Sequence, residues 1–260
     1  ADSIAHKADE KGLEFMSYLS PDVPSRLIGD PGRLRQVLVN LSGNALKFTN
    51  DGEIYIKGEL AEDLGDKVKI RFLVKDTGIG IPKGKQATIF DSFTQADGST
   101  TRTYGGTGLG TTISKQLTEM MGGEIGVESP ADRNLKLETH NSTTQPLNHS
   151  TRIGGPGSAF SFTAVFTKQK GEKALLPKEE IDLSNLRVLV VDDNQTNRYI
   201  LMEYLRAWGC LPVEAMGGKE ALSILKESVS SREPFNLILT DFQMPEMGGF
   251  DLAKEIRATE

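Results

Sequence analysis

The chain has 260 residues, a length that corresponds to one large domain or two smaller ones. Its composition, 37% hydrophobic and 25% charged, is typical of a folded protein and excludes extensive disorder. The net charge of −6 disfavours non-specific nucleic-acid binding, and the single cysteine, Cys210, excludes an internal disulfide. No run approaches the roughly 18 apolar residues of a membrane span, so we expect no transmembrane segment here and a cytoplasmic location.

The composition along the chain predicts two globular stretches joined by a linker. The first covers residues 1–167, the charged linker covers 168–185, and the second stretch covers 186–260. Within the first stretch, residues 131–153 are polar and lack a regular period. They predict a long surface loop inserted between two strands.

The first strong element is a helix predicted for DPGRLRQVLVNLSGNALKF (30–48), whose aspartate can cap it and whose proline suits its first turn. Apolar residues recur along one side of this helix, and Asn40, Asn44 and Lys47 form a polar stripe beside them. Amide oxygens suit Mg²⁺ and an ammonium group suits phosphate, so the stripe is a candidate ligand site. An amphipathic helix with a polar flank is the alternative.

A strand is predicted for VKIRFLVKD (68–76), where apolar side chains alternate with polar ones. Asp76 falls on the inward side at its end, and an inward carboxylate needs a donor such as the exocyclic amine of a purine. Gly78 and Gly80 follow and allow the backbone to approach a flat ligand closely. A glycine turn after a strand, with a solvated aspartate, is the alternative.

A glycine-rich segment, YGGTGLG (104–110), leads into a stretch with helical periodicity. Such a turn offers free N–H groups and the positive end of the helix dipole to phosphates. It is not a Walker A loop, because no Lys-Ser/Thr pair follows the last glycine, and its glycine order differs from the dinucleotide fingerprint. A flexible hinge loop is the alternative.

In their order, the Asn-containing helix, DTGIG (76–80), IFDSFTQ (89–95) and GGTGLG (105–110) resemble the ATP-binding catalytic domain of sensor histidine kinases. That family shares its nucleotide fold with type II topoisomerases, a heat-shock chaperone and a mismatch-repair protein. The resemblance covers about residues 1–167 and implies an α/β fold, the two-layer sandwich of the Bergerat type. The closing GPGSAFSFT (155–163) is similar to the family's last glycine turn and strand.

The resemblance implies a role for each matching residue. Asn44 would bring Mg²⁺ to the triphosphate of ATP, and Lys47 would contact phosphate. Asp76 would accept a hydrogen bond from the adenine amine, while Gly78 and Gly80 would shape the adenine wall. The phosphates would lie against Arg102 and the glycine segment formed by Gly105, Gly106, Thr107, Gly108, Leu109 and Gly110.

The resemblance also implies that Phe90 and Phe93 pack the mobile lid that lies between them and the glycine segment. The chain departs from the family pattern at Thr111, where leucine is usual, and in its insertion at 131–153. Neither departure touches an implied ligand contact, so we expect nucleotide binding to be retained.

The residue type at position 40 distinguishes phosphoryl transfer from ATP hydrolysis. Related ATPases carry a glutamate at this position, one helical turn before the magnesium-linked asparagine, where it activates water. A neutral amide is a poor base at pH 7, so Asn40 favours positioning a transferable phosphoryl group in a kinase over hydrolysis. An ATPase of the superfamily that shares this nucleotide fold (GHKL type) and a non-catalytic nucleotide sensor are the alternatives.

The second stretch alternates strands and helices, and two of its apolar strands end in acids. The carboxyl ends of parallel strands meet at one edge of a doubly wound sheet, so Asp192, Asp193 and Asp241 should converge there. Three close carboxylates repel one another unless a cation such as Mg²⁺ lies among them; unrelated strand-end acids are the alternative. The predicted strands are 187–193, 211–215 and 235–241, and the predicted helices are 195–207 and 218–228.

VLVVDDN (188–194) and LTDFQMPEMGG (239–249) resemble the receiver domain of response regulators, which has a flavodoxin-like fold. By that resemblance Asp241 is the phosphoacceptor, and Asp192 and Asp193 are ligands of Mg²⁺. The sequence stops near the third helix, so we expect an incomplete receiver that lacks the last two strands and does not accept phosphate normally.

The chain contains no His-Glu/Asp-x-x-x-Pro box for a phosphorylated histidine. His6, in IAHKADEKG, is expected in the strand that enters the catalytic domain, and His140 and His149 fall in the polar loop. The resemblance as a whole is to a hybrid sensor histidine kinase that passes phosphate from ATP to a histidine and then to a receiver aspartate. The partners that it implies are an upstream dimerisation domain, a second copy in a homodimer, and a histidine phosphotransfer protein or response regulator.

Overall fold

The chain divides into two compact units, Ala1–Gly171 and Glu172–Glu260. The point of division falls within the charged segment 168–185 that the sequence predicts as a linker. Within the part of the chain that the structure describes, no helix is both long and apolar enough to cross a membrane. The structure, a computed structural model, describes residues 2–91, 109–130, 155–169 and 182–258.

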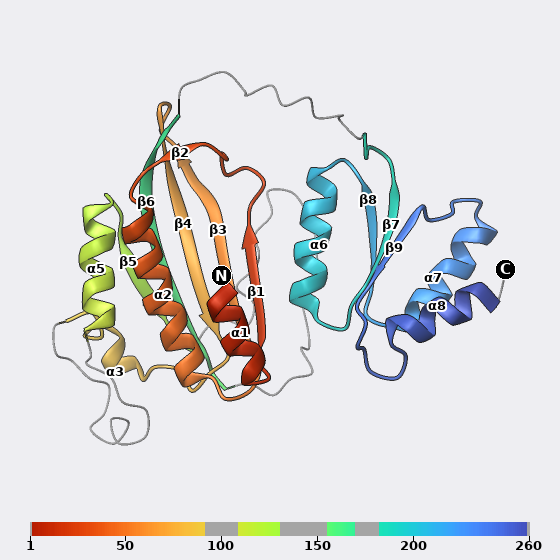
Figure 1. The fold of residues 1–260 in the computed structure, drawn as a ribbon, viewed down its shortest axis with the longest axis horizontal. Helices are drawn as coiled ribbons and strands as arrows, with labels where there is room; N and C mark the ends of the chain where they lie inside the picture. The colour runs from red at the N-terminus through yellow and green to blue at the C-terminus, as the bar shows by residue number, and fades with distance from the viewer. Residues whose placement is uncertain (1, 92–108, 131–154, 170–181, 259–260) are drawn as a thin grey trace. The chain divides into compact units, whose positions relative to one another are not determined.

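The first unit is a mixed sheet covered by helices on one face (Figure 1). Its strand order is β1-β3-β4-β6-β2, with β5 paired to β6 beside this path; β1 and β3 are parallel and the other pairs are antiparallel. Helices α1, α2 and α5 enclose one core with the sheet, which confirms the predicted two-layer α/β sandwich. The elements are α1 (Asp2–Glu10), β1 (Glu14–Leu19), β2 (Leu27–Ile28), α2 (Pro31–Phe48), β3 (Glu53–Asp63), β4 (Lys67–Asp76), α3 (Lys83–Gln86), α5 (Gly110–Met120), β5 (Ile125–Glu128) and β6 (Ser158–Lys168).

Helix α2 carries core residues and candidate site residues on different sides. It begins as predicted: the side chain of Asp30 accepts a hydrogen bond from the backbone N–H of Arg33 at 3.0 Å, and Pro31 is the first helical residue. Val37 and Leu41 on its apolar side are fully buried. Burying each such side chain stabilises the fold by about 1.5–3 kcal/mol, which fixes the helix on the sheet.

Strand β4 lies in the middle of the sheet, between β3 and β6. Its inward side chains alternate as predicted and are buried: Val68, Ile70, Phe72, Val74 and, at the end, Asp76. The same alternation that builds the core therefore places one carboxylate at its edge.

The prediction that His6 lies in a strand was wrong, because the segment around it is helix α1. Ile4 and Ala8 are buried against the core, whereas His6 between them is exposed. In a strand all three would lie on the same face, so this pattern is that of a helix. Gly12 then adopts a φ of +69° and ends the helix before β1 begins.

The second unit is a parallel sheet of order β8-β7-β9 with α6 on one face and α7 and α8 on the other (Figure 1). Val188 and Val190 of β7 pack with Met202 of α6, whereas Leu189 and Val191 join the core on the opposite face. This burial on both faces explains the continuous apolar run of β7 and confirms the doubly wound prediction. The elements are β7 (Arg187–Val191), α6 (Gln195–Ala207), β8 (Leu211–Ala215), α7 (Gly218–Ser230), β9 (Leu237–Thr240) and α8 (Gly249–Ala258).

Candidate functional site

Asp76 is a buried carboxylate at the end of β4, only 4% exposed. Its Oδ1 accepts a hydrogen bond from the backbone N–H of Gly78 at 2.8 Å, and its Oδ2 accepts one from the hydroxyl of Ser158 at 2.5 Å. Burial raises the pKa of Asp76, and the bonds from Ser158 and Gly78 oppose that rise. Reasoning from the sequence missed Ser158; its place in GPGSAFSFT, directly after the last glycine, was the available signal.

Backbone hydrogen bonds join the turn that follows Asp76 to the glycine turn that precedes β6. Gly155 donates to the carbonyl of Thr77 at 2.6 Å, and Gly157 donates to the carbonyl of Gly78 at 2.9 Å. A Cβ atom on Gly78 would lie 2.3 Å from the carbonyl oxygen of Phe48, so only glycine permits this approach to the end of α2. The end of β4, the end of α2 and the turn before β6 therefore meet at Asp76.

The polar stripe of α2 faces α5 at the position of Asn40. The Asn40 amide donates to the carbonyl of Gly110 at 3.3 Å and to the hydroxyl of Ser114 at 3.4 Å, and its oxygen accepts from Gln36 at 2.9 Å. Asn44, one turn later, is half-buried. Asn40 thus joins α2 to the first turn of α5, a contact that the sequence alone did not predict.

The start of α5 is also tied to the segment after α3. The hydroxyl of Thr111 donates to the carbonyl of Ile89 at 2.6 Å, and that of Thr112 donates to the carbonyl of Asp91 at 3.2 Å. Between these two points, Phe90 packs edge-to-face on Phe160 of β6, with ring centroids 6.3 Å apart. The family departure at Thr111 therefore coincides with a hydrogen bond that leucine cannot form.

Several predicted site residues in the first unit take defined places, and others fall outside the described part of the chain. Lys47 lies near the end of α2 with its ammonium 4.8 Å from the centre of the Phe48 ring. Gly80 follows the Asp76 turn with a φ of +72°. Leu109 immediately precedes α5, and Gly110 begins it. The predicted residues Phe93, Arg102, Gly105, Gly106, Thr107 and Gly108, and the insertion 131–153, lie outside the described residues.

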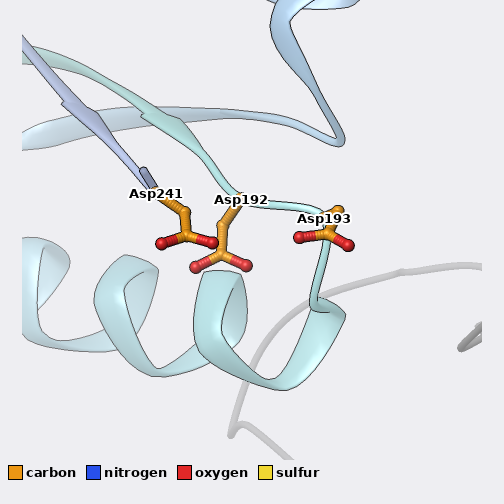
Figure 2. A group of neighbouring side chains, drawn as sticks. All are labelled: Asp192, Asp193 and Asp241. Atoms are coloured by element: carbon orange, nitrogen blue, oxygen red, sulfur yellow. The ribbon is translucent and has the colours of Figure 1, made fainter. Parts of the chain in front are cut away.

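The second unit brings together the three aspartates that the sequence singled out (Figure 2). Asp192 and Asp193 follow β7, and Asp241 follows β9 at the same edge of the sheet. One carboxylate oxygen from each residue lies within 4.8 Å of the others. Asp192 is buried, and this burial, with the charges of Asp241 and Asp193, raises its pKa to about 6.

The donor set of this cluster suits a divalent cation. Carboxylate oxygens are hard ligands of the kind that Mg²⁺ and Ca²⁺ prefer. Burial and, to a smaller extent, the charges of the neighbouring carboxylates raise the pKa of Asp192. A cation among the three groups offsets both effects, because it attracts each carboxylate. The cluster therefore has the composition and spacing of a cation site open to solvent at Asp193, which is exposed.

Two sequence models of known families match the chain in succession. Residues 29–165 match the family described as histidine kinase-, DNA gyrase B-, and HSP90-like ATPase. Residues 188–260 match the response regulator receiver domain. The order of the matches agrees with the order of the two units.

Some similar proteins match the chain over nearly its whole length, and others match part of it. The chain is 33% identical over 269 residues to the sensory/regulatory protein RpfC of Xanthomonas campestris pv. campestris, covering 98% of this chain and 35% of that protein. It is 34% identical over 269 residues to the hybrid signal transduction histidine kinase K of Dictyostelium discoideum, covering 99% and 20%. It is 43% identical over 155 residues to the signal transduction histidine-protein kinase BarA of Escherichia coli, covering 60% and 17%. The chain thus spans about a third or less of the length of these relatives.

A solved structure shares the fold. Full-length ShkA, crystallised in complex with AMPPNP, matches 100% of this chain and 54% of its own with a TM-score of 0.61 and 23% sequence identity. The first family match alone covers more than half of the chain. This chain therefore belongs to the histidine kinase-, DNA gyrase B-, and HSP90-like ATPase family, and a response regulator receiver domain follows its nucleotide-binding domain.

Proposed function

We propose that this chain is the catalytic portion of a hybrid sensor histidine kinase, which transfers the γ-phosphoryl group of ATP to a histidine on a dimerisation domain outside this chain. The observation that carries the proposal is the buried carboxylate of Asp76, held by Ser158 and Gly78 where the turn after β4 approaches the end of α2. Family membership and the similarity to hybrid kinases support the same conclusion.

In this proposal Asp76 recognises adenine. Each carboxylate oxygen can accept two hydrogen bonds, so the bonds from Gly78 and Ser158 leave capacity for the exocyclic amine of the base. The backbone at Gly78 and Gly80 forms the wall against which the flat ring lies. A guanine, which carries a carbonyl oxygen at that place, would oppose the carboxylate with a second acceptor.

The phosphates lie toward α2 and the glycine segment in the same proposal. Asn44 offers an amide oxygen to Mg²⁺, and Lys47 offers its ammonium to phosphate. Bound Mg²⁺ would neutralise charge on the β- and γ-phosphates during transfer. The chain itself positions the nucleotide and carries out little covalent chemistry. The remaining phosphate contacts are Arg102, Gly105, Gly106, Thr107, Gly108, Leu109 and Gly110.

Asn40 supports phosphoryl transfer over hydrolysis. Its side chain is an amide, which does not accept a proton from water near neutral pH. Its amide N–H groups already donate to Gly110 and Ser114, and its oxygen accepts from Gln36. Asn40 therefore serves the catalytic site by placing α5 beside α2, with no general base at this position.

In the whole hybrid kinase, with a complete receiver domain, Asp241 of the second unit is proposed as the phosphoacceptor. Its carboxylate attacks the phosphorus of a phosphohistidine, a new O–P bond replaces the N–P bond, and the imidazole leaves. Asp192 and Asp193 would hold Mg²⁺ beside the reacting oxygen, at the edge where the three carboxylates meet. The proposed partners are an upstream dimerisation domain, a second copy in a homodimer, and a histidine phosphotransfer protein or response regulator. We place the catalytic chemistry in the cytoplasm, where ATP is available.

The test combines the whole chain with labelled ATP, Mg²⁺ and a separately produced dimerisation domain that carries the phosphoacceptor histidine. We expect an acid-labile phosphohistidine on the added domain. Asp76→Asn should weaken ATP binding by about 1–3 kcal/mol, the scale of a lost charge-assisted hydrogen bond, and reduce transfer accordingly. Asp66→Asn is the matched control, because Asp66 is exposed at the opposite end of β4.

Other outcomes separate the alternatives. Sustained phosphate release from the chain alone would identify an ATPase. Nucleotide binding with neither release nor transfer would identify a nucleotide sensor. Unchanged ATP affinity in Asp76→Asn would refute the adenine assignment whichever activity is found.

A further inference from the structure

Arg198 is a buried cation beside the aspartate cluster, and no role for it could be predicted from the sequence. It lies in the second turn of α6 and is 4% exposed. Its Nη1 donates to the main-chain carbonyl of Asp192 at 2.7 Å, and its Nε donates to Oε2 of Glu214 on β8 at 3.0 Å. One guanidinium therefore joins α6, β8 and the end of β7.

We propose that Arg198 is a positioning residue of the cation site: by binding the carbonyl oxygen of Asp192, it fixes the peptide that carries this carboxylate beside Asp241. This role presupposes the cation site proposed above. Arg198 acts through Asp192 and does not itself touch the cation.

The surroundings of Asp192 show what the arginine adds. The N–H of Asp192 donates to the carbonyl of Ala215 at 3.2 Å, and Oδ1 accepts from the N–H of Asn194 at 2.8 Å. These two bonds hold the backbone N–H and the side-chain carboxylate of Asp192. The carbonyl oxygen of Asp192 is held by Arg198. With all three groups bound, Asp192 cannot rotate its carboxylate away from the cluster without breaking a hydrogen bond.

The helix places Arg198 where this bond can form. Asn194 caps α6 by accepting from the N–H groups of Thr196 and Asn197, at 2.7 and 3.2 Å, and Arg198 begins the hydrogen-bonded ladder with a bond to the Asn194 carbonyl at 3.1 Å. Side chains on a helix tilt toward its N-terminus, so Arg198 reaches back to the strand end.

Charge and geometry both require arginine here. A buried charge is tolerated only when it is paired and hydrogen-bonded, and Arg198 meets this condition through its ion pair with Glu214. The side chain of Glu214 itself remains 55% exposed. The planar guanidinium supplies two donors in a fixed fork, one for Glu214 and one for Asp192. Charge-assisted bonds of this kind are stronger than neutral ones. Such a bond can hold Asp192, directly after β7, close to two other carboxylates that repel it.

The test measures Mn²⁺ binding to the whole chain without nucleotide, from the free-Mn²⁺ signal in electron paramagnetic resonance. Asp241→Asn should abolish the site in the second unit and so identifies it. Arg198→Gln should weaken Mn²⁺ binding by about tenfold or more, as for other residues that orient metal ligands. Arg198→Lys, which keeps the charge but lacks the fork, should lie between Arg198→Gln and the wild type.

Arg206→Gln is the matched control, because Arg206 lies on the same helix, has a side chain that is 55% exposed, and forms an ion pair with Glu203 one turn earlier. Binding is measured well below each variant's thermal midpoint, so a loss of stability alone does not lower the Mn²⁺ affinity. Wild-type affinity in folded Arg198→Gln would overturn the proposal. If Arg198→Gln does not fold, wild-type affinity in Arg198→Lys would overturn it.

The same experiment separates the two levels of the argument. A wild-type chain that binds no Mn²⁺, or binds it equally after Asp241→Asn, would remove the cation site and the role of Arg198 with it. A wild-type chain that binds Mn²⁺ at the aspartates, together with unaffected Arg198 variants, would remove the role of Arg198 alone.

Discussion

Ser158 and Asp76 lie directly opposite each other on the adjacent strands β6 and β4, and the serine hydroxyl donates a 2.5 Å hydrogen bond to the carboxylate. The two residues are 82 positions apart in the sequence. The N–H of Gly78 supplies the second donor at 2.8 Å, so each oxygen of the buried carboxylate is satisfied. The base of the proposed adenine site is therefore a product of the register between two strands.

Ser158→Ala should destabilise the first unit and weaken ATP binding. The substitution leaves one oxygen of a buried carboxylate without its protein donor, which costs about 1–3 kcal/mol in the free energy of unfolding. It should also raise the pKa of Asp76 further, because the hydroxyl bond favours the ionised form. Urea unfolding and calorimetric ATP titration check this. Ser161→Ala on the same strand is the control, and equal effects of the two substitutions would contradict the role of Ser158.

Gly78→Ala should abolish nucleotide binding. The new Cβ would lie 2.3 Å from the carbonyl oxygen of Phe48 and 2.9 Å from Oδ1 of Asp76, so the backbone of the proposed adenine wall must move. Gly84→Ala is the matched control, because its Cβ would meet no atom within 4 Å. Nucleotide titrations of both variants decide the point: normal binding by Gly78→Ala would show that the close approach is dispensable.

Asn40→Asp should loosen the contact between α2 and α5. The amide donor to Gly110 and Ser114 becomes an acceptor that faces the Gly110 carbonyl, and we expect a loss of about 1–2 kcal/mol in the free energy of unfolding. Gln36→Ala removes only the exposed bond to the Asn40 oxygen and should cost less. If Asn40 acts on ligands alone, thermal melting without nucleotide will show no difference between Asn40→Asp and the wild type.

The second unit should lose stability as the pH rises in the absence of divalent cations. The pKa of Asp192 is about 6 in the folded state against an ordinary 3.8, so the folded chain binds the proton more tightly than the unfolded chain. The free energy of unfolding therefore falls between pH 3.8 and about 6, by on the order of 2 kcal/mol, and stays lower above that window.

This pH dependence can be followed in one unit of the whole chain. Trp208 is the only tryptophan of the sequence and lies at the end of α6, so its fluorescence reports unfolding of the second unit. Asp192→Asn should remove the fall, and millimolar Mg²⁺ should reverse it by favouring the ionised carboxylates. A fall of equal size in Asp192→Asn would assign the effect to another group.

Local patterns were sufficient for most of the elements that the sequence predicted, α1 excepted, and for much of the aspartate cluster. Asp30 and the proline after it marked the start of α2, and the alternation in β4 put Asp76 on the inward side. The convergence of Asp192 and Asp241 followed from the rule that parallel strands end at the same edge. Each of these predictions needs only neighbours along the chain or a known direction of pairing.

Contacts between distant segments could not be predicted in the same way. The bond from Ser158 to Asp76 depends on sheet register, and the bond from Asn40 to Gly110 depends on how two helices pack. Arg198 looked like an ordinary helix residue until the fold buried it against β8. The error at His6 was different, because the sequence itself places polar His6 between apolar Ile4 and Ala8, a pattern that fits a helix better than a strand.

The separation of β4 and β6 has a consequence for synthesis on the ribosome. Ribosomes make chains from the N-terminus at about 5–20 residues per second, so the 82 residues between Asp76 and Ser158 take roughly 4–16 s. During that interval β4 lacks its neighbour β6, and the carboxylate that we propose holds adenine lacks its serine donor. The nascent first unit therefore cannot complete the proposed nucleotide site until β6 emerges. Until then one edge of β4 is exposed, and this is the stage at which chaperones would protect the nascent chain.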